Sequence, residues 1–364
     1  MFIYKTNAKT YNNIGDIDMR RFLLPESGDF YKANLHCHTT YSDGKFTPEE
    51  VKKIYKDHGY SIVAYTDHDI MIDHNDLADD DFLPLRGYEM EITEPSNGRE
   101  NKFLKTCHLC LIALESDNFR QVCYHRSKYV FKGALEHLDE VKFYEDEPDF
   151  ERYYTPERIN EMIKIARDKG FFVTYNHPSW SLESYPEYIK YEGMNALEIY
   201  NSTEVHGFGD YNPRVYDDIL RAGRRIYCIA ADDNHNGGVP GRKSDTAFKG
   251  FTMIKADKLQ YESITTALKD GHFYASTGPE IYSLYIEKDE NGLRVHIECS
   301  DAECIMLHTG IRKAGAAWAP NGEALTKASF PIDPDCNYIR LSVRDASGKV
   351  ANTNAYFVDE FFEN

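Results

Sequence analysis

The chain has 364 residues, of which 41% are apolar and 28% charged, a composition typical of a folded globular protein of two to three domains. Forty-two Lys and Arg against 60 Asp and Glu leave a net charge of −18, which repels phosphate backbones and anionic membranes. Long nucleic acids and membrane surfaces are therefore excluded as expected partners. The longest apolar runs, 109–114 and 226–231, fall far short of the roughly 20 residues that a membrane-spanning helix needs.

The N-terminal segment turns polar after Tyr4 and builds no apolar stretch of a secretory signal, so we expect a cytoplasmic protein. The eight cysteines are too sparse for a disulfide scaffold, and we expect them to be reduced. Cys107 and Cys110 form one C-x-x-C pair. Because a zinc ribbon needs a second pair, we expect these two side chains to pack in the core.

Residues 1–32 show no clear periodicity, and we interpret them as an N-terminal extension. After them, short apolar runs alternate with helices that begin at a capping residue followed by proline and end at glycine. The three helices are expected to run from Thr47-Pro48 to Gly59, from Thr155-Pro156 to Gly170, and from Asn212-Pro213 to Gly223. In the first, Glu50 completes a capping box with Thr47.

Eight apolar runs of strand length alternate with these helices. They cover residues 33–37, 61–66, 83–90, 107–113, 171–176, 196–200, 226–231 and 250–254. Alternation of buried strands with helices predicts an α/β fold, either a barrel or a parallel sheet.

The pattern changes near residue 280, where the apolar period becomes two. Leu293, Val295 and Ile297 alternate with polar residues behind an Asn-Gly turn, as expected of half-buried antiparallel strands. We therefore predict three parts, an extension (1–32), an α/β domain (33–280) and a small antiparallel β-sandwich (281–364).

A group of potential metal ligands follows the first predicted strand. His36 and His38 are two residues apart on an extended segment, so both side chains point to the same side. Asp43 follows in a Ser-Asp-Gly turn that can bring its carboxylate back over the pair.

Histidines and acids also lie in or directly after other predicted strands. These residues are His68, Glu89, His108, His177, the adjacent Asp232 and Asp233, and His235. In barrel folds the carboxyl ends of the strands meet at one face, which would gather these side chains into a single cluster. Mixed imidazole and carboxylate ligands suit zinc, manganese or iron rather than calcium or magnesium alone.

Residues 31–280 resemble the PHP (polymerase and histidinol phosphatase) domain family of metal-dependent phosphoesterases. The resemblance rests on the motifs Leu-His36-Cys-His38, Thr-Asp-His68-Asp, Gly-Tyr-Glu89, His177-Pro and Asp233-Asn-His235. It implies a distorted seven-stranded (β/α) barrel and a site with two or three divalent metals. The implied ligands are His36, His38, Asp43, His68, Glu89, His108, His177, Asp233 and His235, with Glu89 as the bridging carboxylate.

Two features refine the resemblance. Asp43 stands where many members have a histidine, and motif spacing favours Asp233 as the ligand, with Asp232 as the second choice. The segment Tyr274-Ala-Ser-Thr-Gly-Pro followed by a β-domain is similar to a sub-branch whose members mostly lack an assigned substrate.

Other polar residues have two open interpretations each. Asp67 and Asp69 either orient metal-bound imidazoles or are ordinary loop acids. His206 is either a general acid or a surface histidine. Lys45, Arg242 and Lys243 either bind a phosphate group or are solvated cations; these three are assigned to loops at the ligand end of the strands.

We expect an enzyme that hydrolyses a small phosphate ester by means of a metal-bridging hydroxide. The expected cofactors are two or three zinc, manganese or iron ions, and the expected catalytic residues are Glu89, His206 and Arg242. An amidohydrolase-like reaction is one alternative, although no predicted strand offers a lysine at a ligand position. A non-catalytic binding module stabilised by metal is another.

Overall fold

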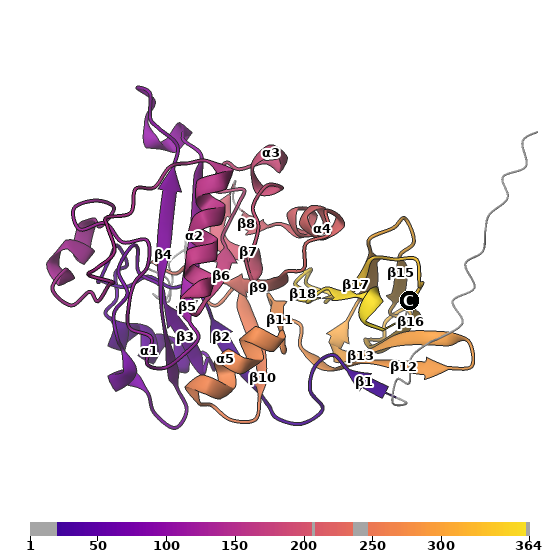
Figure 1. Ribbon diagram of the computed structural model, residues 1–364. Coiled ribbons are helices and arrows are strands. Elements are labelled where there is room, and N and C mark those ends of the chain that lie inside the picture. The colour runs from indigo at the N-terminus through magenta and orange to yellow at the C-terminus, as the bar shows by residue number, and fades with distance from the viewer. Residues whose placement is uncertain (1–19, 206–207, 236–246, 362–364) are drawn as a thin grey trace, which may run out of the picture.

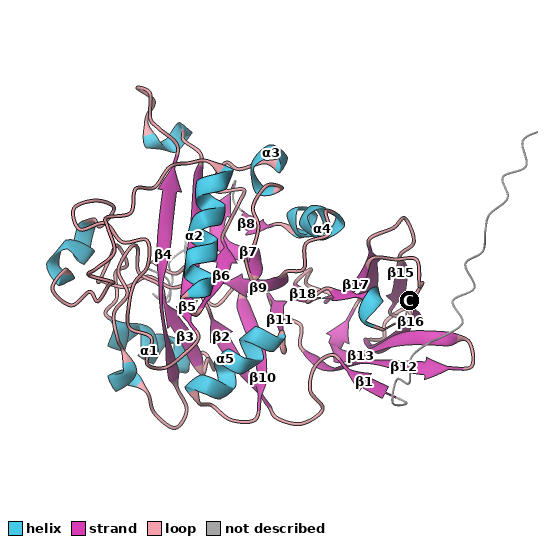
Figure 2. Cartoon of the chain, viewed as in Figure 1, coloured by secondary structure: helices cyan, strands magenta, loops and turns pink. Residues whose placement is uncertain are grey.

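The computed structural model describes residues 20–205, 208–235 and 247–361 of the chain. Strands make up most of the fold, and the α-helices lie around the larger of two bodies (Figures 1 and 2). The fold is α/β with a mixed sheet and few helices, as the alternation of apolar runs predicts in outline.

The larger body is built on one mixed sheet. Its strands are β2 (Asp29–Asn34), β3 (Ile62–Tyr65), β4 (Leu83–Thr93), β5 (Thr106–Ala113), β6 (Phe171–Tyr175), β7 (Ala196–Val205), β8 (Phe208–Tyr211), β9 (Tyr227–Ala231), β10 (Phe251–Ala256) and β11 (Phe273–Ser276). The spatial order is β11-β10-β2-β3-β4-β5-β6-β7-β8, and β9 also pairs with β7. Strands β2, β3 and β4 are parallel, as are β6, β7 and β9, whereas β5 runs antiparallel to both its neighbours. Seven of the eight predicted strands are present at the expected positions. The first is shifted, because β2 ends at Asn34 and shares only residues 33–34 with the predicted run 33–37.

The three predicted helices are present, although the Asn212 side chain does not cap the third of them. The α-helices are α1 (Pro48–Lys56), α2 (Pro156–Asp168), α3 (Tyr185–Tyr188), α4 (Pro213–Arg221) and α5 (Tyr261–Asp270). Thr47 caps α1 and shares a capping box with Glu50, and Thr155 caps α2. Gly59, Gly170 and Gly223 follow the three predicted helices with positive φ, a conformation that glycine adopts without a Cβ clash. Short 3₁₀ helices are η1 (Asn75–Leu77), η2 (Asn101–Phe103), η3 (Lys132–His137) and η4 (Val358–Glu360).

The predicted seven-stranded barrel is not confirmed, because the sheet is not closed. Both edges of β2 are occupied, one by β3 in parallel and the other by β10 in antiparallel register. Strand β9 therefore cannot add to β2. In the described part of the chain, Cys37 and Asn234 form an isolated bridge past the ends of these two strands. The single bridge brings the ends of β2 and β9 together, and the site is built on those ends.

The C-terminal strands are antiparallel and two sheets enclose their core. One sheet contains β1 (Arg20–Phe22), β12 (Ile281–Asp289), β13 (Gly292–Ala302) and β16 (Leu325–Pro331); the other strands are β14 (Cys304–Thr309), β15 (Gly315–Trp318), β17 (Tyr338–Arg344), β18 (Val350–Thr353) and β19 (Tyr356–Phe357). Ile286 and Val295 of the first sheet pack in one core with Leu341 and Val343 of the second.

The second of these sheets is continuous with the large sheet, since β18 pairs with β11. The N-terminal strand β1 also belongs to the C-terminal body, where it pairs with β12 (Figure 1). The two bodies are thus joined through main-chain hydrogen bonds. The division of the chain at residues 32 and 280 stays a prediction.

A buried ion pair also joins the bodies. The Arg340 guanidinium on β17 is 1% exposed and donates through Nε and Nη2 to the two carboxylate oxygens of Asp217 on α4, at 2.8 and 2.9 Å. The Tyr338 hydroxyl donates to the same carboxylate at 3.0 Å. This pairing fixes α4 against β17.

Two sequence-based expectations concern the whole chain. All eight cysteines are free and buried, in line with the absence of a disulfide scaffold. Within the described residues, no helix has the length and apolar character needed to cross a membrane.

Candidate metal centre

The structure brings all nine implied ligands together at the ends of the strands. They form overlapping groups whose potential ligand atoms lie within 4.8 Å of one another. The groups are His38, Asp43, His68 and His235; His36, His38, Glu89 and Asp233; His36, His177 and Glu198; and His68, Glu89 and His108. Each group combines segments that are distant in sequence. Glu89, His108 and Glu198 lie in strands, and the other members lie in the segments that follow strands.

Glu89, on β4, lies at the centre of the cluster and is 1% exposed. Its Oε1 atom is 3.1–3.3 Å from three imidazole nitrogens, and its Oε2 atom is 3.3 Å from two more. These belong to His36, His108 and His177, and to His38 and His68, respectively. Burial alone would raise the pKa of the Glu89 carboxyl, but the surrounding imidazoles, His36 foremost, hold it well below its usual value. Both oxygens of one carboxylate therefore face imidazoles on different sides, as a bridging ligand requires.

Asp233 and the two histidines after β2 form the most compact part of the cluster. The Asp233 Oδ1 atom is 3.3 Å from His36 Nε2 and 3.0 Å from His38 Nε2, and these two nitrogens are 3.1 Å apart. Burial would lower the pKa of His38, yet its hydrogen bonds to Asp233 and Glu89 raise it to about 10. Asp233 has a φ of +49°, a conformation that non-glycine residues rarely adopt.

The neighbouring Asp232 faces away from the cluster. Its carboxylate accepts main-chain N–H groups of Phe248, Lys249 and Gly250 at 2.7–3.0 Å, and the Tyr55 hydroxyl at 3.0 Å. Burial outweighs these hydrogen bonds and raises the pKa of Asp232 to about 6. Of the two adjacent acids, Asp233 is therefore the one placed to bind a cation.

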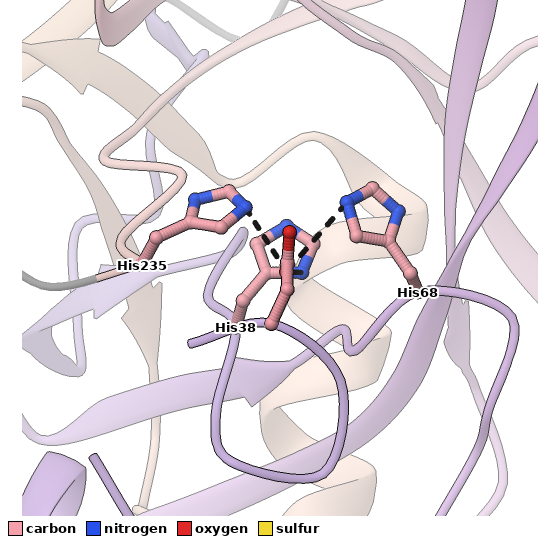
Figure 3. A group of neighbouring side chains, drawn as sticks. His38, His68 and His235 are labelled. Atoms are coloured by element: carbon pink, nitrogen blue, oxygen red, sulfur yellow. Dashed lines mark ion pairs between the residues drawn. The ribbon is translucent and has the colours of Figure 1, made fainter. Parts of the chain in front are cut away.

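A second part of the cluster surrounds Asp43. Its Oδ1 atom lies 3.3 Å from His235 Nε2, 3.8 Å from His38 Nδ1 and 3.9 Å from His68 Nε2. Figure 3 shows these three imidazoles converging from separate segments. Burial alone would raise the pKa of the Asp43 carboxyl. The hydrogen bond from His235 and the nearby imidazole charges outweigh burial and lower this pKa well below its usual value.

The geometry fits divalent cations. Ligands at about 2.0–2.1 Å around a tetrahedral ion lie about 3.3 Å from one another, close to the 3.0–3.3 Å separations around Glu89 and Asp233. Several buried imidazole nitrogens of the described residues make no well-directed hydrogen bond, namely Nδ1 of His38, Nδ1 of His68 and both ring nitrogens of His108. Nδ1 of His68 and Nδ1 of His108 do lie close to the Glu89 carboxylate, at 3.3 and 3.1 Å. Buried polar atoms without a partner are costly, and cation coordination would satisfy them.

Glu198, on β7, is a residue of the candidate site that sequence reasoning missed. It is fully buried, and its Oε1 atom lies 2.7 Å from His36 Nδ1. Its Oε2 atom accepts the main-chain N–H of His177 at 3.1 Å. Such a carboxylate fixes the ring orientation of a metal-binding histidine and leaves Nε2 directed at the cluster. The signal in the sequence is an acid inside the apolar run 196–200.

Asp67 and Asp69 do not hydrogen-bond to the imidazoles in the described part of the chain. Asp67 accepts the N–H and hydroxyl of Thr39, both at 2.7 Å, and the Ser42 hydroxyl at 2.6 Å, so it holds the loop that carries Asp43. Asp69 forms a buried ion pair with Arg152 at 2.6 Å. Both acids support the loops around the site.

The cluster lies in the wall of a cavity of about 700 Å³. Besides cluster residues, the cavity is lined by Glu91, Thr93, Asn101, Lys102, Leu104, Thr106, Phe131, Lys132, Trp180 and Leu182. The Lys132 ammonium lies 2.8 Å from Asp43 Oδ2 and places a positive charge beside the ligands. Lys45 is exposed and is not part of this lining.

Three predicted residues, His206, Arg242 and Lys243, lie outside the described residues. Their expected roles stay predictions.

Part of the chain matches a known protein family. Residues 34–172 match the model of the PHP domain family, so the resemblance expected from the sequence is confirmed over that segment. A curated relative is DNA polymerase III subunit alpha of Campylobacter jejuni, which is 24% identical over 231 residues. That match covers 56% of this chain, whereas the chain spans only 18% of the length of the polymerase subunit.

Two solved structures are similar to this chain, each at 16% identity. One is a two-domain protein from Bacteroides vulgatus containing a predicted PHP-like metal-dependent phosphoesterase, with a TM-score of 0.43 over 94% of this chain and 99% of that chain. The other, from Bifidobacterium adolescentis, is assigned as a metal-dependent phosphoesterase, with a TM-score of 0.35 over 60% of this chain and 91% of that chain.

Proposed function

We propose that the chain is a metal-dependent phosphoesterase that hydrolyses a small phosphate ester. The observation that carries the proposal is the cluster of nine histidine and acid side chains, with Glu89 at its centre, in the wall of a cavity large enough for a small molecule. Two or three divalent ions, zinc, manganese or iron, are the proposed cofactors, and such ions supply Lewis acidity and a nucleophile at neutral pH.

The residues of the chain would provide geometry and charge. Glu89 holds two halves of the cluster at a fixed separation, and Glu198 orients His36. Lys132 offers a positive charge for an oxygen of the substrate phosphate. His206 is the proposed general acid for the leaving alcohol, and Arg242 a further cation for the phosphate.

The substrate is proposed to be small. The net charge of −18 opposes the approach of long nucleic acids and anionic membranes. A cytoplasmic location is part of the same proposal.

The amidohydrolase alternative has less support in the residues around the site. Enzymes of that kind usually rely on a metal-bridging lysine, whereas here the carboxylate of Glu89 lies between the imidazoles, with one oxygen toward His36 and the other toward His68. A non-catalytic, metal-stabilised module would not need all nine side chains.

The test is a panel of phosphomonoesters, amides and lactones, offered to protein stripped by chelator and to the same protein reloaded with zinc, manganese or iron. We expect phosphate release only from the reloaded protein. Turnover of amides or lactones without phosphate release would favour the amidohydrolase, and no turnover of any compound would favour the binding module.

Lys132→Met is expected to raise KM for a phosphomonoester about tenfold while leaving the metal content unchanged. The residue after Lys132, Gly133, donates its N–H to Ser42 O at 2.9 Å, and this bond keeps the backbone of Lys132 next to the loop that carries Asp43. The approach is so close that a Cβ on Gly133 would collide with Thr40 O. Initial rates against substrate concentration check the prediction. Lys128→Met is the matched control, since that ammonium pairs with Glu151; equal KM values in the two variants would remove Lys132 from the phosphate site.

A further inference from the structure

Two large apolar side chains are exposed in the cavity that contains the cluster. Trp180 and Leu182, in the loop after β6, are 45% and 48% exposed, and both line the cavity. The Trp180 ring centroid lies 5.0 Å from that of His177 and 5.4 Å from that of His108, in edge contacts. An exposed indole therefore borders the cluster directly.

The loop is held in place by buried groups. Trp180 donates its main-chain N–H to Asp210 Oδ2 at 3.0 Å. Glu183, 7% exposed, accepts hydroxyl hydrogen bonds from Tyr154 at 2.7 Å and Tyr175 at 2.5 Å, and also from Tyr191. The loop therefore presents Trp180 from a fixed backbone.

Leu182 adds a second, independent sign of a built surface. Its φ is +59°, a conformation that is strained for a leucine, and its side chain nevertheless remains half exposed. Strained residues at a cavity wall mark positions whose direction matters for function. The surrounding loop keeps Leu182 in this conformation, with its apolar side chain at the cavity wall.

The other groups of the cavity define the charge that it accepts. Lys132 lies beside Asp43, and Lys102 pairs with Glu100 at 2.7 Å. Glu91 lines the cavity with Thr93 as its hydrogen-bond donor, and no cation among the described residues pairs with its carboxylate. Away from Lys132, this wall disfavours a second anionic group.

We propose that the substrate is a phosphomonoester whose alcohol carries a flat aromatic group without negative charge, and that this group packs on Trp180 and Leu182. The inference rests on the proposed function for the phosphate end and adds the class of the leaving alcohol. A cavity of about 700 Å³ has room for such a group beyond the phosphate. Indole binds flat rings by offset or edge contacts, and Leu182 extends the apolar wall.

The first experiment compares two substrates on the metal-loaded full chain, 2-naphthyl phosphate and glycerol 3-phosphate. Trp180→Ala is expected to lower kcat/KM for the naphthyl ester about tenfold, mainly through KM, and to leave that for the glycerol ester unchanged. Trp180→Phe should retain most of the preference, because it keeps a flat ring. Trp318→Ala, which removes the other tryptophan of the chain, outside the cavity lining, is the control. Equal losses on both esters, or no loss on either, would overturn the inference.

The second experiment does not depend on turnover. In the Trp318→Phe variant, Trp180 is the one remaining tryptophan, so its fluorescence reports on the subsite. We expect 4-nitrobenzyl alcohol to quench it with a saturating curve and 4-nitrobenzoate, an anion of similar size, to quench it at least about tenfold more weakly. Saturable quenching without hydrolysis of any phosphate ester would uphold the subsite and refute the proposed function. Hydrolysis with linear, unselective quenching would uphold the function and refute the subsite.

Discussion

Glu89→Gln is expected to lower kcat/KM for a phosphate ester by about a thousandfold or more and to reduce the metal content of the purified protein. The amide keeps the shape of the side chain but removes the charge that faces five imidazoles at 3.1–3.3 Å. Elemental analysis and initial rates on the same preparation check both parts.

Glu94→Gln provides the matched control, because Glu94 directly follows β4 and pairs with Arg99 at 3.1 Å, outside the cluster. This variant should retain metal and activity. If Glu89→Gln retained activity within about tenfold of the parent, with its metal in place, the reaction would take place elsewhere.

Asp217→Ala is expected to destabilise the protein by about 3–5 kcal/mol, since it leaves the Arg340 guanidinium buried without its carboxylate. The double variant Asp217→Ala with Arg340→Met should recover much of the loss, because it removes the buried charge as well. The shift of the urea midpoint of the metal-loaded protein measures both effects.

Arg225→Ala is the control for this second prediction. Arg225 pairs with Asp359 and Glu360 between the same two parts of the chain, but its side chain is 48% exposed, so we expect a loss below about 1 kcal/mol. Equal midpoints for Asp217→Ala and Arg225→Ala would show that the buried pair contributes nothing special.

The pH dependence of stability should also reveal the contribution of the ion pair between Asp217 and Arg340. Burial opposes the ionisation of Asp217, but the hydrogen bond from Arg340 lowers the pKa of its carboxyl below the usual value. A lowered folded-state pKa gives stability that is present above the unfolded-state pKa of about 3.9 and is lost as the pH falls through the folded-state value. The parent should therefore lose more stability on acidification than Asp217→Ala.

Most of the cluster could be predicted because its members occupy regular positions. His36 and His38 share one side of an extended segment, and His68, His177 and Asp233 follow apolar strands whose ends the topology brings together. These are local patterns. Helix starts at Thr47 and Thr155 could be predicted for the same reason, since a cap and a proline act within one turn.

Glu198 could not be predicted, because its role depends on a partner 162 residues away. It lies inside β7 rather than after it, and no local pattern distinguishes a buried carboxylate that supports an imidazole. The position of Lys132 depends on its φ of +51° and on the close approach of Gly133 to the Asp43 loop. Neither can be inferred from residue types alone.

The predicted closure of the sheet into a barrel was wrong, because strand pairing also depends on residues that are distant in sequence. An apolar run predicts that a strand exists, but the neighbour at its edge is chosen by long-range packing. Strand β10 occupies the edge of β2 that a closed barrel would give to β9, and β18 extends the sheet beyond β11. We expected a barrel and a sandwich with separate sheets. In the structure, one sheet runs through both bodies.

The most direct test of the central claim is the metal content of the full chain, purified without any chelator and analysed for zinc, manganese and iron. Nine ligand side chains in overlapping groups predict two or three ions per chain, because one ion of four to six ligands would leave several buried imidazoles unpaired. One ion or none per chain would contradict the account.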